Sequence, residues 1–398
     1  MSYHSTNRRP AYGRARFSGQ TGGNKRGPKK ENIHPSRFIK AAKMVEIENY
    51  APTHAFADFD IAELLKTNLS ANNIMTPSPI QDQAIPAGLA GKDVVGIANT
   101  GTGKTLAFAI PMLNKLMSDK QSRALILAPT RELAQQIEEQ CRLIGRGTGL
   151  TGALLIGGSS MGPQLRDLRA RPRIVIGTPG RIKDHIERNT LNLSSFNMIV
   201  LDEFDRMLDM GFLPDVRFIL EKLHQERQSF FFSATLDARV RGLIQEFSHD
   251  PVTISVKTGE TVDSVEQNIV TFNSRSEKIE KLHELLISKE GTKMLVFDDT
   301  QRSVERLSDE LVARGFRSDA IHGGKSQGQR QRALKRFKQS DVTILVATDV
   351  AARGIDVPDI THVSNYSTPN SYDDYVHRIG RAGRAGRTGH ALTFIEKY

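Results

Sequence analysis

Short apolar runs recur along the chain, and each one ends in a polar or glycine-rich element that is followed by a segment with helix-like spacing. In the first half these runs cover residues 125–128, 174–176, 198–201 and 230–232. Continuous apolar runs that alternate with helices are typical of a parallel sheet buried on both faces. The pattern therefore predicts an α/β fold with a parallel sheet.

A polar stretch at residues 257–264 interrupts this pattern, which restarts with apolar runs at 294–297, 343–347, 361–363 and 391–395. A chain of 398 residues is long enough for about two domains with sizeable cores. We therefore expect one α/β domain at residues 54–256, a linker at 257–264 and a second α/β domain at 265–398.

The net charge of +10 comes almost entirely from residues 1–40, where ten lysines and arginines stand against a single acid, Glu31. This tail is rich in Arg, Gly, Ser and Asn and contains few apolar residues, so we expect it to be disordered. Tyr3, Tyr12 and Phe17 lie among its arginines, which favours a nonspecific RNA tether. A tail that only improves solubility is the alternative.

Other sequence features narrow the class of protein. No apolar run approaches the roughly 18 residues of a membrane span, so we expect no membrane association and no secretory signal. Cys141 is the only cysteine, which excludes an internal disulfide or a cysteine metal cluster and favours a cytoplasmic location. We expect Cys141 to be a packing residue rather than a nucleophile.

Residues 98–105 form a glycine-rich loop between an apolar run at 94–97 and a helix-compatible segment at 106–110. This order is that of a P-loop, in which backbone N–H groups and a helix N-terminus bind phosphate. Lys104 is then expected to reach the terminal phosphates and Thr105 to bind Mg²⁺. Ala98 stands where the general pattern has its first glycine, and a turn formed by chance is the alternative.

Two adjacent acids, Asp202 and Glu203, follow the apolar run at 198–201, as the metal-binding acid of a P-loop nucleotide hydrolase does. We expect Asp202 to bind Mg²⁺ and Glu203 to orient or deprotonate the attacking water. If the strand continues, Asp205 would face the same side as Glu203. Capping of a following helix is the alternative and suits Asp205 best.

A second phosphate site is predicted at residues 377–387, which contain His377 and four arginines spaced largely by glycine and alanine. Guanidinium groups stay charged and match phosphate oxygens, although a solvated basic face is the simpler alternative. Because ligands bind beyond the carboxyl ends of parallel strands, we expect this cluster and the loop at 98–105 to meet in a cleft between two sheets.

From about Phe56 onward the chain resembles the DEAD-box ATP-dependent RNA helicases of the bacterial type. The resemblance rests on motifs that occur in the family's order: 77–81, 98–105, 129–134, 157–158, 178–181, 202–205, 233–235, 348–356 and 377–384. Phe204 departs from the family, which has alanine there, and requires space for a bulky ring. Asn73 stands in place of a glycine, and asparagine tolerates positive φ.

The resemblance implies two tandem RecA-like domains that use ATP and Mg²⁺. It implies that Gln81 reads adenine beside Phe56, that Asp356 contacts the ribose, and that Arg381 and Arg384 are arginine fingers. The ATP-binding set would be Phe56, Gln81, Thr100, Gly101, Thr102, Gly103, Lys104, Thr105 and Asp356. Asp205, Ser233, Thr235 and His377 would couple hydrolysis to domain closure.

The resemblance also implies an RNA-binding set, namely Thr130, Arg131, Gly158, Thr178 and Arg181 in the first domain and Thr300, Arg330 and Thr348 in the second. Hydroxyls, guanidiniums and glycine amides suit contacts to phosphates and 2′-hydroxyls with little sequence readout. Each residue has an alternative as a helix cap or turn, most clearly Thr178 before Pro179.

We therefore predict an RNA-dependent ATPase that acts as a monomeric RNA helicase, with ribosomal or other ribonucleoprotein partners. An ATP-gated RNA clamp or annealing chaperone with little unwinding is the first alternative. A DNA translocase or another P-loop nucleotide hydrolase is the second, and a pure scaffold is disfavoured by the presence of Lys104, Asp202 and Glu203.

Overall fold

The computed structural model describes residues 1, 33–42, 50–99, 101–256, 264–289, 292–352, 355, 357, 359–383 and 387–397. Most of the predicted tail and residues 257–263 of the predicted linker lie outside this set. So do three of the predicted site residues, Thr100, Asp356 and Arg384.

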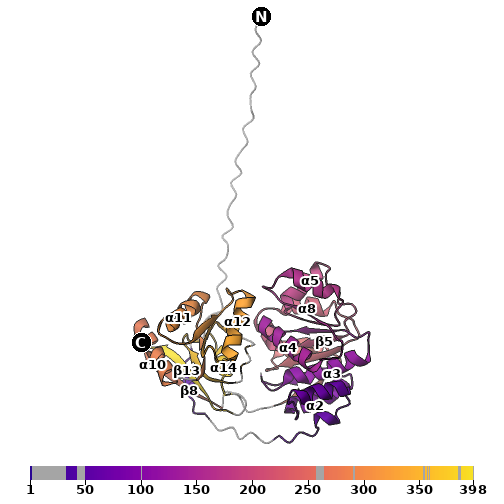
Figure 1. Cartoon of the computed structure of the whole chain (residues 1–398), viewed down its shortest axis with the longest axis horizontal. Helices are drawn as coiled ribbons and strands as arrows, with labels where there is room; N and C mark the ends of the chain where they lie inside the picture. The colour runs from indigo at the N-terminus through magenta and orange to yellow at the C-terminus, as the bar shows by residue number, and fades with distance from the viewer. Residues whose placement is uncertain are drawn as a thin grey trace.

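The described chain folds around two sheets of parallel strands, which lie side by side (Figure 1). The first has the order β3-β4-β2-β5-β6-β1-β7. Its strands are β1 Val94–Ile97, β2 Ala124–Leu127, β3 Gly152–Leu155, β4 Ile174–Gly177, β5 Met198–Leu201, β6 Gln228–Ser233 and β7 Val252–Ser255. The α/β prediction and the apolar runs assigned to β2, β4, β5 and β6 are confirmed.

Helices cover both faces of the first sheet. They are α1 Glu63–Ala71, α2 Pro79–Leu89, α3 Lys104–Ser118, α4 Arg131–Ile144, α5 Met161–Arg169, α6 Pro179–Glu187, α7 Phe204–Asp209, α8 Leu213–Leu220 and α9 Ala238–Phe247. Alternate residues of each central strand enter opposite cores, as Ile126 and Leu125 do. Because both faces are buried, these strands read as continuous apolar runs.

The second sheet has the order β10-β11-β9-β12-β13-β8, and all of its ladders are parallel. Its strands are β8 Val265–Phe272, β9 Lys293–Phe297, β10 Ser318–Ile321, β11 Ile344–Ala347, β12 Ile360–Asn365 and β13 Gly389–Glu396. Its helices are α10 Arg275–Ser288, α11 Gln301–Ala313, α12 Gln327–Lys338, α13 Asp349–Ala352 and α14 Tyr372–Ile379. Alternate residues again fill two cores, with Leu295 on one face and Val296 on the other.

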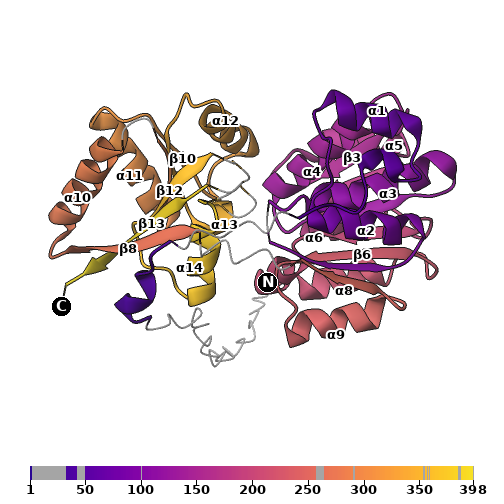
Figure 2. The same cartoon turned by 90° about the horizontal axis from the view of Figure 1, so that it is seen from below.

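The strand ends carry the motifs identified in the sequence. In the first domain, β1 leads into the glycine-rich loop, β5 into the adjacent acids, and β6 into Ser233–Thr235. In the second, β9 and β11 lead into Thr300 and Thr348. The view in Figure 2 shows that α12 and α13 of the second domain face the first domain. The fold therefore brings the strand-end motifs of both sheets toward one interface.

Two local features bear on the sequence expectations. Asn73 has φ of 57°, so the turn before α2 keeps a left-handed residue without glycine, as expected. Within the described residues, none of the helices combines the length and the apolar character that crossing a membrane requires.

Candidate active site

The glycine-rich loop joins β1 to α3, and two of its glycines hold left-handed conformations. Gly101 has φ of 86° and Gly103 has φ of 93°. Lys104 begins α3 and is buried, and its Nζ donates to the carbonyl of Ala98 at 3.0 Å. The lysine charge therefore lies at the base of the loop and next to a helix N-terminus, which together favour an anion.

The start of α2 is hydrogen-bonded to this loop. Gln81 Nε2 donates to the carbonyl of Gly103 at 2.9 Å, and Ser78 Oγ donates to the carbonyl of Thr102 at 2.7 Å. The Ser78 N–H in turn donates to Gln81 Oε1, which closes a capping box at the helix start. A Cβ at Gly103 would lie 2.3 Å from Gln81 Nε2, so this contact requires glycine. The start of α2 is therefore joined to the loop by two direct hydrogen bonds.

Phe56, the predicted neighbour of an adenine ring, lies in the short helix η2, Phe56–Asp58. Its ring is 5% exposed and packs edge-to-face against Phe59, with the centroids 6.0 Å apart. Phe56 therefore belongs to the core beneath the segment that leads to α2.

Asp202 and Glu203 lie at the carboxyl end of β5, and both side chains are buried. Glu203 has φ of 50° and ψ of 51°, a left-handed conformation that is costly for a residue with a side chain. Its N–H donates to Asp202 Oδ1 at 3.0 Å. Strain of this kind is often retained at functional sites because it aims a side chain.

Burial raises the pKa of Asp202 to about 6, and the nearby Lys104 charge opposes that rise. Burial acts in the same direction on Glu203, but the charges of Arg206, Lys104 and Arg381 outweigh it and lower the pKa of Glu203. Glu203 is therefore held as a carboxylate by cations from both domains, because Arg381 belongs to the second.

The donor set at Asp202 and Thr105 suits Mg²⁺. Mg²⁺ is usually held by one or two carboxylates together with substrate phosphates and water, rather than by a full set of protein ligands. Across the described residues, no group of three or more His, Cys, Asp or Glu side chains could hold a metal ion. A buried carboxylate with a raised pKa beside a phosphate-type loop fits this requirement, because a divalent cation would favour its ionised form.

Phe204 begins α7 directly after Glu203, and its side chain is fully buried. The ring packs against Phe231 with the centroids 5.7 Å apart. It points into the core on one face of the first sheet. The bulky ring is thus accommodated among apolar neighbours, and the backbone still places Asp202 and Glu203 at the strand end.

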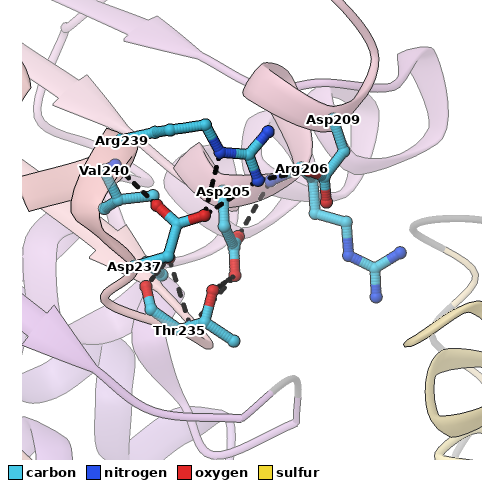
Figure 3. A network of polar contacts seen from close by, with 8 residues as sticks. Asp205, Arg206, Asp209, Thr235, Asp237, Arg239 and Val240 are labelled. Atoms are coloured by element: carbon cyan, nitrogen blue, oxygen red, sulfur yellow. Dashed lines mark hydrogen bonds and ion pairs between the residues drawn. The ribbon is translucent and has the colours of Figure 1, made fainter. Parts of the chain in front are cut away.

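Asp205 is held by the loop after β6 (Figure 3). Its Oδ2 accepts hydrogen bonds from the N–H of Ala234 at 3.1 Å, the N–H of Thr235 at 3.0 Å and the hydroxyl of Thr235 at 3.1 Å. Ser233 Oγ donates to the carbonyl of Thr235 at 2.6 Å. Three of the four predicted coupling residues, Asp205, Ser233 and Thr235, are therefore brought together within the first domain.

The fourth, His377, lines a pocket between the domains. This pocket is lined by Arg206 from the first domain and by Phe297, Asp349, Ala352, Asp374, His377, Arg378 and Arg381 from the second. Figure 3 shows that the Arg206 side chain extends away from the Asp205–Thr235 cluster toward the ribbon of the second domain. The pocket thus joins Arg206, in the helix that follows β5, to the arginine-rich segment of the second domain.

Two arginines of the predicted phosphate cluster, Arg378 and Arg381, make different contacts. Arg378 is 2% exposed and makes a two-pronged ion pair with Asp349, at 2.6 and 2.7 Å, and also donates to the carbonyl of Ser367. It therefore stabilises the second domain internally. Arg381 donates to the carbonyl of Ile355 at 3.0 Å and acts electrostatically on Glu203.

The predicted RNA residues of the first domain gather around one loop. Arg131 lies against Gly158, where a Cβ would be 1.9 Å from Arg131 Nη1, and Gly158 has φ of 71°. Arg181 donates to the carbonyl of Ser159 at 3.2 Å. Thr130 caps α4 by accepting a hydrogen bond from the N–H of Leu133, whereas the hydroxyl of Thr178 makes no such capping bond. Other predicted residues of this set lie in the second domain.

In the second domain, Thr300 caps α11 and Thr348 is buried before α13. Arg330 lies in α12 and forms an ion pair with Glu132 of the first domain, with Nη2 and Oε2 2.8 Å apart. Gln327 Nε2 also contacts Glu132 Oε1 at 3.4 Å. Burial lowers the pKa of Arg330, and the Glu132 charge only partly offsets that effect. Arg330 therefore bridges the domains in this conformation.

Two site features escaped prediction from the sequence. Arg206 stands three residues after Glu203 and lowers the pKa of that carboxylate. Asp82 follows Gln81 and accepts four hydrogen bonds from residues 50–54. A basic residue within one helical turn of a predicted catalytic pair could have indicated Arg206. For Asp82 the sequence contained none, because its partners depend on the path of the preceding chain.

Comparisons with known proteins agree with this geometry. The profile of the DEAD/DEAH box helicases matches residues 78–243, and that of the helicase conserved C-terminal domain matches residues 277–386. The chain is 43% identical to the "DEAD-box ATP-dependent RNA helicase CshA" of Bacillus licheniformis, over 80% of this chain and 65% of that protein. It is also 43% identical to the "ATP-dependent RNA helicase CshA" of Listeria monocytogenes, over 86% of this chain and 66% of that protein.

Among solved structures, S. cerevisiae Dbp5 bound to RNA and ADP BeF3 matches with a TM-score of 0.77 and 29% identity, over 86% of this chain and 90% of that one. A DEAD box protein from Methanococcus jannaschii matches with a TM-score of 0.50 and 38% identity, over 86% of this chain and 93% of that one. The chain spans 64 to 66% of the length of the curated relatives that it matches.

Proposed function

The chain belongs to the DEAD-box helicase family, with two RecA-like α/β domains, and from that premise we propose that it is an ATP-dependent RNA helicase of the bacterial type. In this proposal it couples ATP binding and hydrolysis to RNA clamping and to local duplex unwinding or ribonucleoprotein remodelling. The observation that carries the proposal is the composite site, a pocket lined by Arg206 of the first domain and by His377 and Arg381 of the second. The charge of Arg381 also helps to lower the pKa of Glu203.

We propose these roles for the ATP site. Gln81 and the segment at Phe56 bind the adenine, while Thr100, Gly101, Thr102, Gly103 and Lys104 hold the phosphates. Asp356 contacts the ribose, and Thr105 and Asp202 hold Mg²⁺. ATP supplies the phosphoanhydride bond that is hydrolysed, and Mg²⁺ neutralises charge on its phosphates.

The protein residues then carry the chemistry. Glu203 is ionised and positioned at a strand end, so it orients or deprotonates the attacking water. Arg381 and Arg384 approach from the second domain and stabilise the negative charge that develops in the transition state. Because these arginines reach the site only when the domains meet, hydrolysis depends on closure. We propose that four residues couple this closure to hydrolysis, namely Asp205, Ser233, Thr235 and His377.

RNA is the proposed partner, and its backbone is the proposed point of contact. Arg131, Gly158 and Arg181 form a cluster at one edge of the first domain, with Thr130 and Thr178 at the starts of α4 and α6. Thr300, Arg330 and Thr348 extend this set to the second domain. Contacts of this kind imply little sequence specificity, so ribosomal or ribonucleoprotein partners would direct the enzyme.

An ATP-gated RNA clamp or annealing chaperone with little unwinding is the second candidate, favoured by the basic segment that precedes residue 41. In either case we propose a monomer in the cytoplasm, with domains at residues 54–256 and 265–398.

Steady-state ATP hydrolysis tests the proposal when it is measured with single-stranded RNA, with single-stranded DNA and without nucleic acid. We expect hydrolysis that RNA stimulates more than DNA does, and that Glu203→Gln removes while nucleotide binding persists. Equal stimulation by DNA would favour a DNA translocase, and hydrolysis by Glu203→Gln at the wild-type rate would overturn the assigned role. Release of a labelled RNA strand from a duplex then separates unwinding from clamping.

A further inference from the structure

The short helix η1, Pro35–Phe38, precedes the first domain in the sequence but lies on the second domain. Figure 2 shows this indigo segment beside β8, β13 and α14, whereas the next indigo elements, α1 and α2, lie in the other lobe. We propose that residues 35–40 bind the second domain at the free edge of β8, and that the chain leading from there to the first domain is a second tether between the two domains.

Phe38 is the main anchor of this segment. Its side chain is fully buried and belongs to the same apolar core as Val265 of β8 and Tyr375 of α14. The Phe38 and Tyr375 rings pack edge-to-face with centroids 4.7 Å apart, a preferred aromatic geometry. The Arg37 guanidinium lies 3.7 Å from the ring centroid of Tyr372, within the range of a cation–π contact.

Backbone pairing adds a directional contact. Lys40 forms an antiparallel bridge with Gln267 of β8, with N–H to carbonyl distances of 3.0 and 2.8 Å. β8 is the last strand of its sheet, so this bridge covers backbone groups that an edge strand otherwise exposes. Tyr375 Oη donates to Gln267 Oε1 at 2.9 Å, which fixes the same residue from the domain side.

The segment is thus held in two ways, by burial of one aromatic side chain in the core of the second domain and by strand pairing beside it. Ile39, which lies between Phe38 and Lys40, is 53% exposed. Ile39 has an extended backbone, with φ of −118° and ψ of 113°, so its side chain points away from the face on which Phe38 is buried.

The chain is fixed again ten residues later, on the first domain. The side chain of Tyr50 and the N–H of Thr53 donate to Asp82 Oδ2, while the N–H and the ring of His54 contact Asp82 Oδ1 at 3.1 and 2.6 Å. Asp82 is 2% exposed and directly follows Gln81. These hydrogen bonds attach the far end of the tether to the helix that carries the proposed adenine contact.

The two anchors limit how far the domains can separate. Ten residues span at most about 36 Å when fully extended, so the Cα atoms of Lys40 and Tyr50 can never lie farther apart than that. While both anchors hold, the edge of β8 and the start of α2 are kept within the same reach. A short tether keeps two sites at high effective concentration. The expected consequence is a narrower range of open conformations than residues 257–264 alone would allow.

The test uses the full-length protein with the substitution Phe38→Ala and the matched control Ile39→Ala. The rate of hydrogen exchange at the Gln267 amide measures whether the segment is bound, because this N–H donates to the carbonyl of Lys40 in this structure. We expect exchange at Gln267 to accelerate at least tenfold in Phe38→Ala and to stay within twofold of wild type in Ile39→Ala. Unchanged exchange in Phe38→Ala would overturn the binding site.

The distance between two spin labels, one in each domain, measures how far the tether lets the domains separate. The labels are placed at the exposed positions Asp167 and Ile287, one in each domain, after Cys141→Ala, and are measured without nucleotide or RNA. We expect Phe38→Ala to broaden the distance distribution toward longer values. Cleavage at a protease site inserted within residues 43–49 must do the same while leaving Gln267 protected.

A distribution that cleavage leaves unchanged would overturn the tether, even if the segment binds. Cleavage also covers the case in which Phe38→Ala fails to fold. Neither measurement uses ATP hydrolysis or RNA, so a negative result here is distinct from failure of the proposed function.

Discussion

Removing Arg330 should weaken closure of the two domains by about a hundredfold. In this structure Arg330 pairs with Glu132 across the interface at 2.8 Å, and the two side chains are 8% and 2% exposed. Removing one partner of a buried ion pair costs about 3–5 kcal/mol, because the other charge stays buried without compensation. Gln327 remains 3.4 Å from Glu132, which favours the lower value.

About 3 kcal/mol corresponds to roughly a hundredfold change in the ratio of closed to open protein. The loss should appear in closure and not in folding, because Glu132 regains water when the domains separate. We therefore expect Arg330→Ala to melt near the wild-type temperature. Its RNA affinity in the presence of a non-hydrolysable ATP analogue should fall about a hundredfold. Arg332→Ala, an exposed arginine of the same helix, is the control and should bind like wild type.

A double-mutant cycle separates this effect from the proposed contact of Arg330 with RNA. If the ion pair matters, Glu132→Gln alone should weaken RNA binding in the presence of the analogue, and adding Arg330→Ala should cost less than the sum of the two single changes. Strict additivity, or wild-type affinity of Arg330→Ala, would show that the ion pair does not stabilise the closed state.

Three further predictions concern single sites. Gly103→Ala places a Cβ 2.3 Å from a side chain of α2 at a φ of 93°, so nucleotide affinity should fall tenfold or more in a fluorescence titration. The control is Gly91→Ala, which has a φ of 76° and nothing within 4 Å of the added Cβ, and it should leave the nucleotide affinity unchanged. Burial lowers the pKa of His362 from 6.5 to about 4, so the unfolded chain binds the proton more tightly than the folded protein does. The contribution of His362 to the free energy of unfolding is therefore complete above pH 6.5. It falls by up to about 3 kcal/mol as the pH drops to 4. His362→Gln should lose that dependence in urea titrations at several pH values, while His224→Gln, at an exposed position, should keep it. Phe204→Ala should cost about 3–5 kcal/mol of unfolding free energy through a cavity, and a loss below 1 kcal/mol would show that the ring does not support the core.

The central strands and their motifs were predictable because both depend on local sequence. A strand buried on both faces must be a continuous apolar run, and parallel strands place their ends at one edge of a sheet. This reasoning put the loop with Lys104, the acids Asp202 and Glu203, and the Ser233–Thr235 segment at strand ends, where the structure has them. The turn at Asn73 was predictable for a similar reason, since asparagine tolerates the φ that it adopts.

The strands β3, β7, β8 and β10 were not identified from the apolar pattern. β3, β7 and β8 each have exposed positions, and β3, β7, β8 and β10 all lie at or near sheet edges, so a continuous apolar run is not required of them. Edge strands therefore carry a weaker apolar signal in the sequence than central strands do.

Contacts between distant segments could not be read from the sequence. Arg378 and Arg381 stand three residues apart in the same basic run, yet Arg378 is held by Asp349 within the second domain while Arg381 acts on Glu203. Which of the two faces the site depends on the orientation of α14, and no local pattern encodes that orientation. The burial of Phe38 on the second domain is another such contact, because its partners lie more than two hundred residues away.

The rate of ATP hydrolysis by Arg381→Lys under saturating RNA is the most direct test that the active site is shared by both domains. Lysine keeps the positive charge but loses the guanidinium fork, so folding and ATP binding should persist. We predict that RNA-stimulated turnover falls by on the order of 10³ while the affinity for ATP changes little. Turnover within a few-fold of wild type would contradict it, because hydrolysis would then need no arginine at this position of the second domain.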